Sequence, residues 1–410
     1  MQSVVTETKH KKILGLHPNV FFLGLVSFFT DVSSEMIFTL VPLFLTNVLG
    51  ASMTLVGLVG GVSDSTDALF RLISGRISDA IGKRKFLTTL GYGLATAVKP
   101  LMLLANGWAA VTGIRFGDRI GKGLRSSARD ALLADSLGSK ERGRGFGLHR
   151  AMDTAGAVVG LATVALIIYL FQGTGGFDLQ RDTYRMMVTV GIFPAFVAVL
   201  VLIGFVRETR QEAVKATSAA ILAPAKIAFD LHFKLFLAMM AVFTLGNSSD
   251  FFLILRAQNI HVPLIQVALM LVLFNAVYAG ISMPMGILSD KLGRRKVIAL
   301  GWFIYTLVYL GFAMGNSIWQ VWLLFAGYGL YYGITQGVAS AFVADLVPSE
   351  RRGMAYGLFQ GITGLVLLPA SVIAGWIWNA ISPAATFYFG AALTFLAMMG
   401  MLFLVKERTG

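Results

Sequence analysis

The chain of 410 residues is 56% hydrophobic and only 13% charged, with a mean hydropathy of +0.74. This composition excludes an ordinary soluble globular protein and indicates an integral membrane protein. The net charge of +13 would suit a nucleic-acid-binding protein, but most of the basic residues gather in short loops, so we expect no nucleic-acid partner. The absence of cysteine excludes disulfides, thiolate catalysis and thiolate metal sites.

Apolar runs long enough to cross roughly 30 Å of hydrocarbon as helices recur along the chain. In chain order they predict twelve membrane spans, over residues 18–47, 53–78, 86–105, 107–135, 146–171, 183–206, 229–256, 264–288, 297–315, 318–345, 353–377 and 382–405. The first 17 residues are polar and basic, and no small-residue cleavage site follows a short apolar core, which favours a retained first span over a signal peptide.

The loops between these spans differ in charge according to their side. If both termini are cytoplasmic, the cytoplasmic loops hold most of the lysines and arginines, whereas the opposite loops hold only Arg181, Arg185 and Arg256. The positive-inside rule therefore predicts a multi-pass protein of a bacterial-type inner (plasma) membrane, with both termini in the cytoplasm.

The sequence nearly repeats itself. Residues 75–85 read GRISDAIGKRK and residues 286–296 read GILSDKLGRRK, and nearly the same offset aligns Asp135 with Asp345 and Glu35 with Asp250. These matches predict that the chain consists of two related halves of six spans each. We expect an N-terminal six-helix bundle over residues 1–206, a polar cytoplasmic linker over 207–228 and a C-terminal six-helix bundle over 229–410.

This repeated loop, in a chain of six plus six spans, resembles the signature loop of the major facilitator superfamily. The resemblance covers essentially the whole chain and implies an all-α membrane protein of two pseudo-symmetric six-helix bundles. It also implies that the loops gate the cytoplasmic face of the outward-open state; the alternative is that basic loops only hold orientation. The gating-loop residues that match are Gly75, Asp79, Gly82, Lys83 and Arg84 in the first half and Asp290, Gly293, Arg294 and Arg295 in the second.

The fourth span carries the segment RFGDRIGKGLRSSARD, residues 115–130. On a helical wheel its basic residues share one face with its two acidic residues. A charge that faces lipid costs at least about 2.5 kcal/mol near the bilayer centre, so this face is expected to line a cavity or to meet partners. The basic residues are Arg115, Arg119, Lys122, Arg125 and Arg129.

Two interpretations of this face stay open. Away from the loops, the N-terminal half holds as many acidic as basic side chains, which favours a neutralised salt-bridge network among spans 1, 2, 4 and 5. Alternatively the face binds an anionic solute through Arg115, Arg119 and Lys122, and Arg119 and Lys122 are then the two expected to lack a fixed partner. The family resemblance would make Arg119 the residue that tunes a nearby carboxylate during proton coupling, although Lys122 and Arg125 depart from the family pattern.

Five embedded carboxylates are candidates for carrying a coupled proton: Asp31, Glu35, Asp64, Asp67 and Asp250. Burial favours the protonated acid and a nearby guanidinium favours the carboxylate, so an arginine that moves between conformations would load and release a proton. The alternative is that these acids are fixed salt-bridge partners.

Span 5 begins with His149, Arg150 and Asp153, for which we expect a structural role near the cytoplasmic end. Further along, Gly156 and Gly160 form a Gly-x-x-x-Gly face that is typical of close helix packing. The antiporter signature of the resembled family has such glycines but also a proline that this span lacks.

In the second half, aromatic and amide side chains replace the cationic face of span 4. They are expected to form the less charged wall of a central cavity or, alternatively, to pack in the core. The substrate-cavity candidates on this side are Asn275, Tyr278, Tyr331, Tyr332, Gln336 and Gln360.

No enzyme motif is present. Residues 120–123, IGKG, lack the Ser or Thr and the upstream glycine of a phosphate-binding loop, so we expect neither an enzyme nor an ATP-driven pump. No cofactor and no His or Cys metal cluster are expected, while a carboxylate-lined cation path stays open.

The sequence thus predicts a secondary transporter that works by alternating access, is driven by a proton gradient and exports a small organic solute, anionic or amphipathic. The expected partners are the lipid bilayer, the solute and protons, with the chain a monomer. The alternatives are an uptake permease, a metal or lipid transporter of the same fold, and a transport-dead receptor or scaffold.

Overall fold

The structure, a computed structural model, describes residue 13 and residues 15–81, 83–137, 141–208, 229–348 and 352–405. Within these residues every element is a helix, apart from one isolated bridge between Ile13 and Leu16. The prediction of an all-α protein is confirmed.

Each predicted span has its helix or helix pair, and the predicted ends differ from the observed ones by a few residues. The first six spans are α1 (Pro18–Phe38) with α2 (Val41–Leu43) and η1 (Phe44–Val48), α3 (Met53–Ile81), α4 (Arg84–Val98) with η2 (Lys99–Leu104), α5 (Trp108–Asp135), α6 (Arg142–Gln172) and α7 (Arg181–Phe205). The last six are α8 (Leu231–Gly246) with α9 (Phe251–Asn259), α10 (Leu264–Leu292), α11 (Arg294–Met314), α12 (Ile318–Leu346), α13 (Arg352–Ala380) and α14 (Pro383–Leu404).

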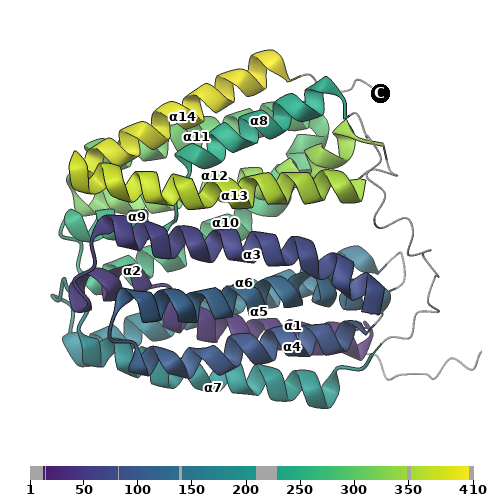
Figure 1. Ribbon diagram of the computed structural model, residues 1–410, viewed down its shortest axis with the longest axis horizontal. Coiled ribbons are helices and arrows are strands. Elements are labelled where there is room, and N and C mark those ends of the chain that lie inside the picture. The colour runs from purple at the N-terminus through teal and green to yellow at the C-terminus, as the bar shows by residue number, and fades with distance from the viewer. Residues whose placement is uncertain are drawn as a thin grey trace, which may run out of the picture.

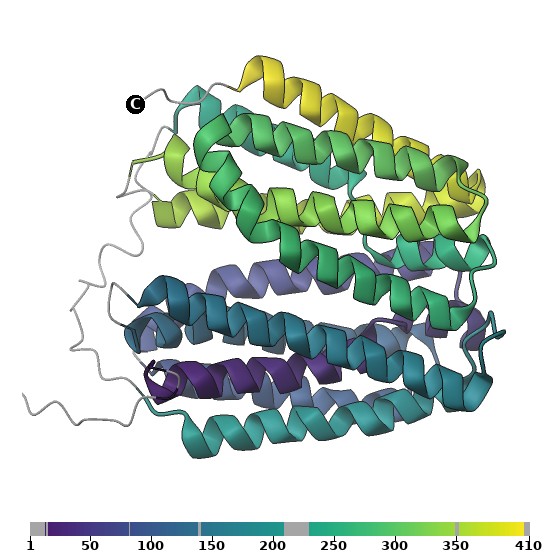
Figure 2. The ribbon, with the colours of Figure 1, turned by 180° about the vertical axis from the view of Figure 1, so that it is seen from behind.

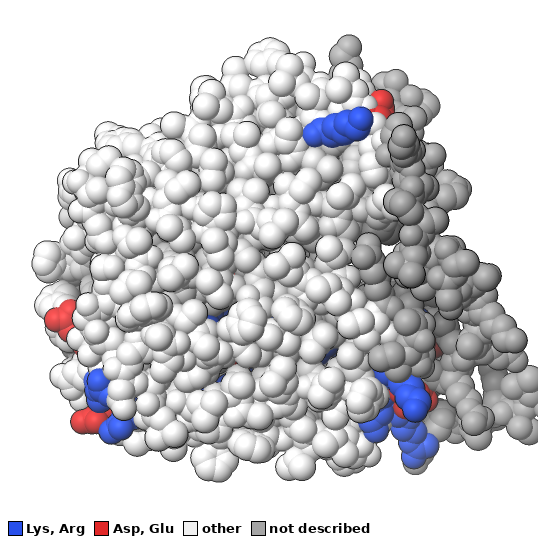
Figure 3. Space-filling view, in the orientation of Figure 1, with Lys and Arg blue, Asp and Glu red and all other residues white. Residues whose placement is uncertain are grey.

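By length and composition, nine helical segments among the described residues are apolar enough to cross a membrane. The three other long helices, α3, α5 and α12, fall outside this set, and all three line the central cavity described below. The charged residues of α3 and α5 that line this cavity are therefore turned away from lipid. Figure 3 shows the result on one face of the molecule, where a broad uncharged band separates charged side chains at the two ends.

The helices form two bundles, α1–α7 and α8–α14, which lie side by side (Figures 1 and 2). Asn19 donates a hydrogen bond to the carbonyl of Arg207 (2.9 Å), and Arg295 donates to the carbonyl of Val405 (2.7 Å). These contacts lie at one end of the molecule, here called the terminal end, and the opposite end is called the α2–α9 end. Residues 209–228, most of the predicted linker, lie outside the described residues, so the domain boundaries stay a prediction.

Helices α1 and α6 approach each other closely through the glycines of span 5. A Cβ atom on Gly156 would lie 2.3 Å from the carbonyl oxygen of Phe28, and one on Gly160 would lie 2.7 Å from that of Val32. Only glycine allows the two backbones to come this near. The predicted packing role of these glycines is confirmed.

The two bundles meet at the α2–α9 end through α3 and α13. A Cβ atom on Gly57 would lie 2.1 Å from the carbonyl oxygen of Ser371, and one on Gly375 would lie 2.3 Å from that of Met53. Nearby, the side chain of Asn379 donates to the hydroxyl of Thr54 at 3.0 Å. Backbone packed directly on backbone leaves no passage between these helices.

The loop between α6 and α7 adds a second contact between the bundles at this end. Asp178 accepts hydrogen bonds from Asn47 (2.7 Å) in its own bundle and from Gln258 (2.8 Å) in the other. The backbone N–H of Leu264 donates to the carbonyl of Gly176 at 2.8 Å. The α2–α9 end is therefore closed in this conformation.

At the terminal end, the two repeated loops make equivalent contacts. Arg84 donates to the carboxylate of Asp135, and Arg294 lies 2.9 Å from that of Asp345. Both pairs join neighbouring helices of one bundle, so the structure supports the internal repeat.

The rest of the predicted gating loop is described in part. Gly293 has a φ of 93°, a conformation that favours glycine. Asp290 pairs with Arg294 of its own loop at 3.4 Å, and Lys83 directly precedes α4. Gly82 lies outside the described residues, and of Gly75 and Asp79 only the backbone, within α3, is described.

Candidate functional site

A cavity of about 730 Å³ lies between the bundles. Helices α1, α3, α5 and α6 line it from one side, and helices α8–α13 line it from the other. Its size is within the usual range for a small-molecule site. Because the cavity is shared between two bundles, its shape depends on how they are placed relative to each other.

Most of the predicted site residues meet in this cavity. All five candidate carboxylates line it, and so do eight of the substrate-cavity candidates: Arg115, Arg119, Lys122, Asn275, Tyr331, Tyr332, Gln336 and Gln360. Tyr278 is not among the residues that line the cavity, although its ring lies near those of Phe274 and Tyr332, which do. Its hydroxyl donates a hydrogen bond to Gln336 at 2.7 Å and accepts one from Arg150. Tyr278 therefore holds the side chain of Gln336, which does line the cavity.

The first wall carries the charges of α3 and α5. Arg71 is paired with Asp67 at 3.0 Å, and Arg119 lies 3.6 Å from Asp118. The ammonium group of Lys122 lines the cavity without an ion pair or hydrogen bond to any described residue. The expectation of no carboxylate partner therefore fits Lys122 and is wrong for Arg119 in this conformation.

Arg115 and Arg125 rest on aromatic rings. The guanidinium of Arg115, which is only 3% exposed, lies 4.8 Å from the ring centroid of Phe38 and 5.5 Å from that of Phe251. Arg125 lies 4.3 Å from the ring of Tyr92. Such contacts partly replace a carboxylate partner, so the fully neutralised salt-bridge network predicted from the charge count does not form among the described residues.

A pair of carboxyl groups joins α1 to α6. The carboxyl groups of Asp31 and Asp153 lie close enough to interact directly. Ser27 donates to Oδ1 of Asp153 at 2.5 Å, and Arg150 lies 3.5 Å from Oδ2. Two ionised carboxylates repel each other and only accept hydrogen bonds, so a proton on one of the two groups would stabilise this contact.

The sequence analysis gave Asp153 only a structural role. Its partner is far away in the chain, and no local spacing reveals which helix face meets which. Ser27, one helical turn before Asp31, is a local signal that extends the polar side of α1 toward Asp153.

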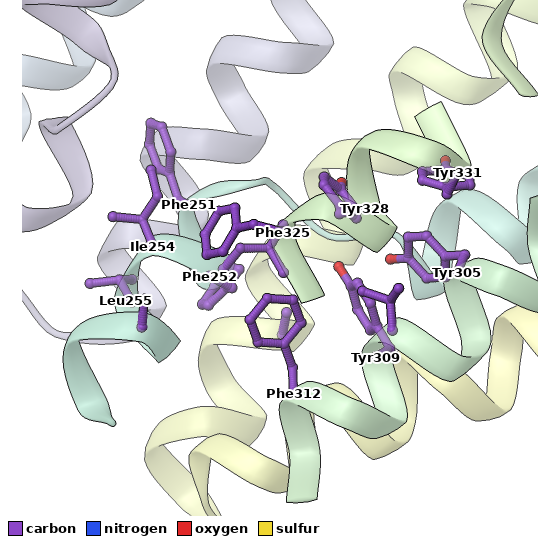
Figure 4. Packing of buried hydrophobic residues seen from close by; sticks show 14 of the residues in the cluster. Phe251, Phe252, Ile254, Leu255, Tyr305, Tyr309, Phe312, Phe325, Tyr328 and Tyr331 are labelled. Atoms are coloured by element: carbon purple, nitrogen blue, oxygen red, sulfur yellow. The ribbon is translucent and has the colours of Figure 1, made fainter. Parts of the chain in front are cut away.

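The second wall is aromatic. Phe243 stacks on Trp302 with their ring centroids 4.6 Å apart, and Tyr331 and Tyr332 on α12 are 5.4 Å apart. Figure 4 shows Tyr305 and Tyr309 of α11 beside Tyr328 and Tyr331 of α12. Ring pairs at these separations stabilise one another, so this wall is a rigid apolar surface.

Asp250 supplies the negative charge of this wall. It follows the segment Asn247-Ser248-Ser249, which separates α8 from α9, and its Oδ1 accepts a hydrogen bond of 2.5 Å from the hydroxyl of Tyr328. The sequence analysis did not identify Phe243, Asn247 or Trp302 as lining residues. The short polar segment within an apolar span is the signal that could have found Asn247.

The chain matches the family model described as Major Facilitator Superfamily over residues 23–255 and 231–410. It is 36% identical over 402 residues to an uncharacterized MFS-type transporter of Methanocaldococcus jannaschii, with 95% of each chain covered. A class E tetracycline resistance protein of Escherichia coli is 33% identical over 153 residues, which cover 37% of this chain and 35% of that protein. The crystal structure of a mutant nucleoside transporter superposes with a TM-score of 0.75 at 13% identity, covering 95% of this chain and all 100% of that one.

Proposed function

The chain belongs to the Major Facilitator Superfamily of transporters, and we propose that it exports a small amphipathic organic solute in exchange for protons. Two bundles that share a central cavity and pack closely at the α2–α9 end support transport by alternating access. The solute binds between the charged wall of α3 and α5 and the aromatic wall of α11 and α12.

The observation that carries the proposal is the close approach of the carboxyl groups of Asp31, which lines the cavity, and Asp153. A transporter that uses a proton gradient needs a group that holds a proton in one conformation and releases it in the other. This pair fits that role, because Asp31 lines the cavity and Asp153 faces Arg150. Arg150 also donates to Tyr278 of the other bundle, so rocking of the bundles would release Arg150 to pair more closely with Asp153. Its charge would then favour the fully ionised pair, and the proton would leave.

The direction of transport is supported by the partial similarity to a tetracycline resistance protein. A membrane protein of this fold that confers resistance to a compound would do so by removing it from the cell. The mixed lining supports an organic solute, because the aromatic wall offers apolar surface and the opposite wall offers charge.

The test is proton movement in proteoliposomes that contain the purified protein and a pH-sensitive dye. A panel of aromatic cations, anions and neutral compounds is added against an imposed pH gradient. With the native chain, at least one compound should dissipate the gradient. Asp31→Asn and Asp153→Asn should each reduce this solute-driven proton flux at least tenfold, because an amide cannot carry the proton.

Asp182→Asn is the matched control, since Asp182 is exposed in the first turn of α7, outside the cavity. It should leave the flux unchanged. Glu35→Gln and Asp67→Asn test the other cavity carboxylates in the same assay. If no compound moves protons, or if both Asp31→Asn and Asp153→Asn keep the native flux, proton exchange through this pair is refuted.

A further inference from the structure

Asp250 is a carboxylate that the protein leaves open to the cavity. Its side chain is exposed, and because it lines the cavity this exposure is to the space that a solute would occupy. Tyr328 satisfies one of its oxygens, and no lysine, arginine or histidine of the described residues forms an ion pair with it. An ionised carboxylate in such a place lacks a counter-charge.

The charged groups around Asp250 do not supply this counter-charge. Asp64 and Glu35, which line the opposite wall of the cavity, are both acidic. Arg115 also stands on that wall, but its Nε donates to Ser63 at 3.2 Å and its guanidinium lies over two phenylalanine rings. The potential at Asp250 therefore favours a positive guest.

Aromatic rings surround this position. The ring of Tyr328, which holds the carboxylate, is 5.4 Å from Tyr332, 5.5 Å from Phe274 and 5.6 Å from Tyr331. Tyr331, Tyr332 and Phe274 all line the cavity. The faces of such rings attract cations, and an aromatic enclosure with one carboxylate suits a bulky organic cation, because it provides charge and apolar contact together.

We propose that Asp250, with the rings of Phe274, Tyr331 and Tyr332, is a subsite for the cationic group of the solute. The solute class is then an aromatic amine or another organic cation with a delocalised or shielded charge. The inference rests on the proposed transport function and names the part of the cavity that selects its solute. Lys122 and Arg119 on the other wall meet the uncharged polar part of the same molecule.

The test uses two probes of the same shape and opposite charge, tetraphenylphosphonium and tetraphenylborate, with the purified full-length protein in detergent. Equilibrium dialysis with radiolabelled probe measures binding at neutral pH. The native protein should bind the phosphonium at least tenfold more tightly than the borate. Asp250→Asn should weaken phosphonium binding at least tenfold, and Asp250→Glu, which keeps the charge, should restore part of it.

Two further comparisons separate a binding role from a folding role. Tyr332→Phe keeps the ring and should bind the phosphonium within about twofold of the native protein, whereas Tyr332→Leu should bind it about three- to thirtyfold more weakly. Asp182→Asn should bind like the native chain, and the elution volume in size-exclusion chromatography checks that each variant is folded.

The inference is overturned if the borate binds more tightly than the phosphonium, if the native protein binds no phosphonium, or if Asp250→Asn binds it like the native chain. Detergent binding requires neither a proton gradient nor transport. Failure here therefore leaves the proton flux of the proposed function untouched, and failure of that flux leaves the phosphonium result standing.

Discussion

Replacing Gly57 with alanine is predicted to open the α2–α9 end. The new Cβ atom would lie 2.1 Å from the carbonyl oxygen of Ser371, whereas ordinary contacts begin at 3.4 Å, so α3 and α13 must separate by roughly 1.3 Å at this point. Overpacking of this kind costs about 1–3 kcal/mol. Because the strain exists only where the two helices touch, it shifts the population toward a conformation in which they are apart, by about 5- to 150-fold.

The distance between two spin labels measures this shift. The chain has no cysteine, so Thr54→Cys and Asn379→Cys provide unique labelling sites on α3 and α13. The native side chains at these positions are 3.0 Å apart across the interface. The continuous-wave spectrum should show strong dipolar broadening in the parent pair, because the labels are in contact. When Gly57→Ala is added, this broadening should decrease, and double electron–electron resonance should show a larger population of long distances.

Two other glycines make the test specific. Gly375→Ala places a Cβ atom 2.3 Å from the carbonyl oxygen of Met53 in the same interface and should act like Gly57→Ala. Gly113→Ala on α5 meets no atom within 4 Å and should leave the distances unchanged. The reasoning is refuted if the two interface variants leave the distribution as it is, or if Gly113→Ala moves it equally.

Two further predictions concern ion pairs and the closed end. The side chains of Arg84 and Asp135 are 17% and 10% exposed, and those of Arg294 and Asp345 are 24% and 49% exposed. Arg84→Ala should therefore cost about 3–5 kcal/mol of stability and Arg294→Ala about 1 kcal/mol or less, as measured by unfolding of the purified protein, and equal losses would contradict this account. Asp178→Ala removes a hydrogen-bond acceptor that both bundles share. It should increase the population of long distances in the same spin-label pair by about fivefold, a smaller effect than that of Gly57→Ala. A shift as large as that of Gly57→Ala would show that the loop, rather than the glycines, closes this end.

The fold was predictable because its signals are local. A run of about 20 apolar residues spans the membrane whatever surrounds it, and a repeat is visible without knowing any contact. The position of the charged face of span 4 was also predictable. Charged side chains are too costly to place against lipid, so this face had to line a cavity or meet partner residues. Four of its five basic residues do line the cavity, and Arg129, nearer the terminal end, instead pairs with Asp130 at 2.9 Å.

The partners of these residues were not predictable. Successive helical residues differ by 100° in direction, so a small rotation of a helix decides which side chain enters the cavity. Tyr278 was expected to line the cavity and instead braces Gln336, while Trp302, in an apolar span without a polar signal, forms part of the wall.

The sequence by itself determined that this chain is a membrane protein of two related halves with charge buried in the first. The length of an apolar run and the repetition of a motif can both be recognised without knowing any tertiary contact. Only the tertiary structure decided that Asp31 meets Asp153, that Asp250 meets Tyr328 and stays open to the cavity, and that Gly57 closes one end. The physical reason is that each of these contacts joins helices distant in the chain, whose rotation and separation are set by packing and not by local sequence.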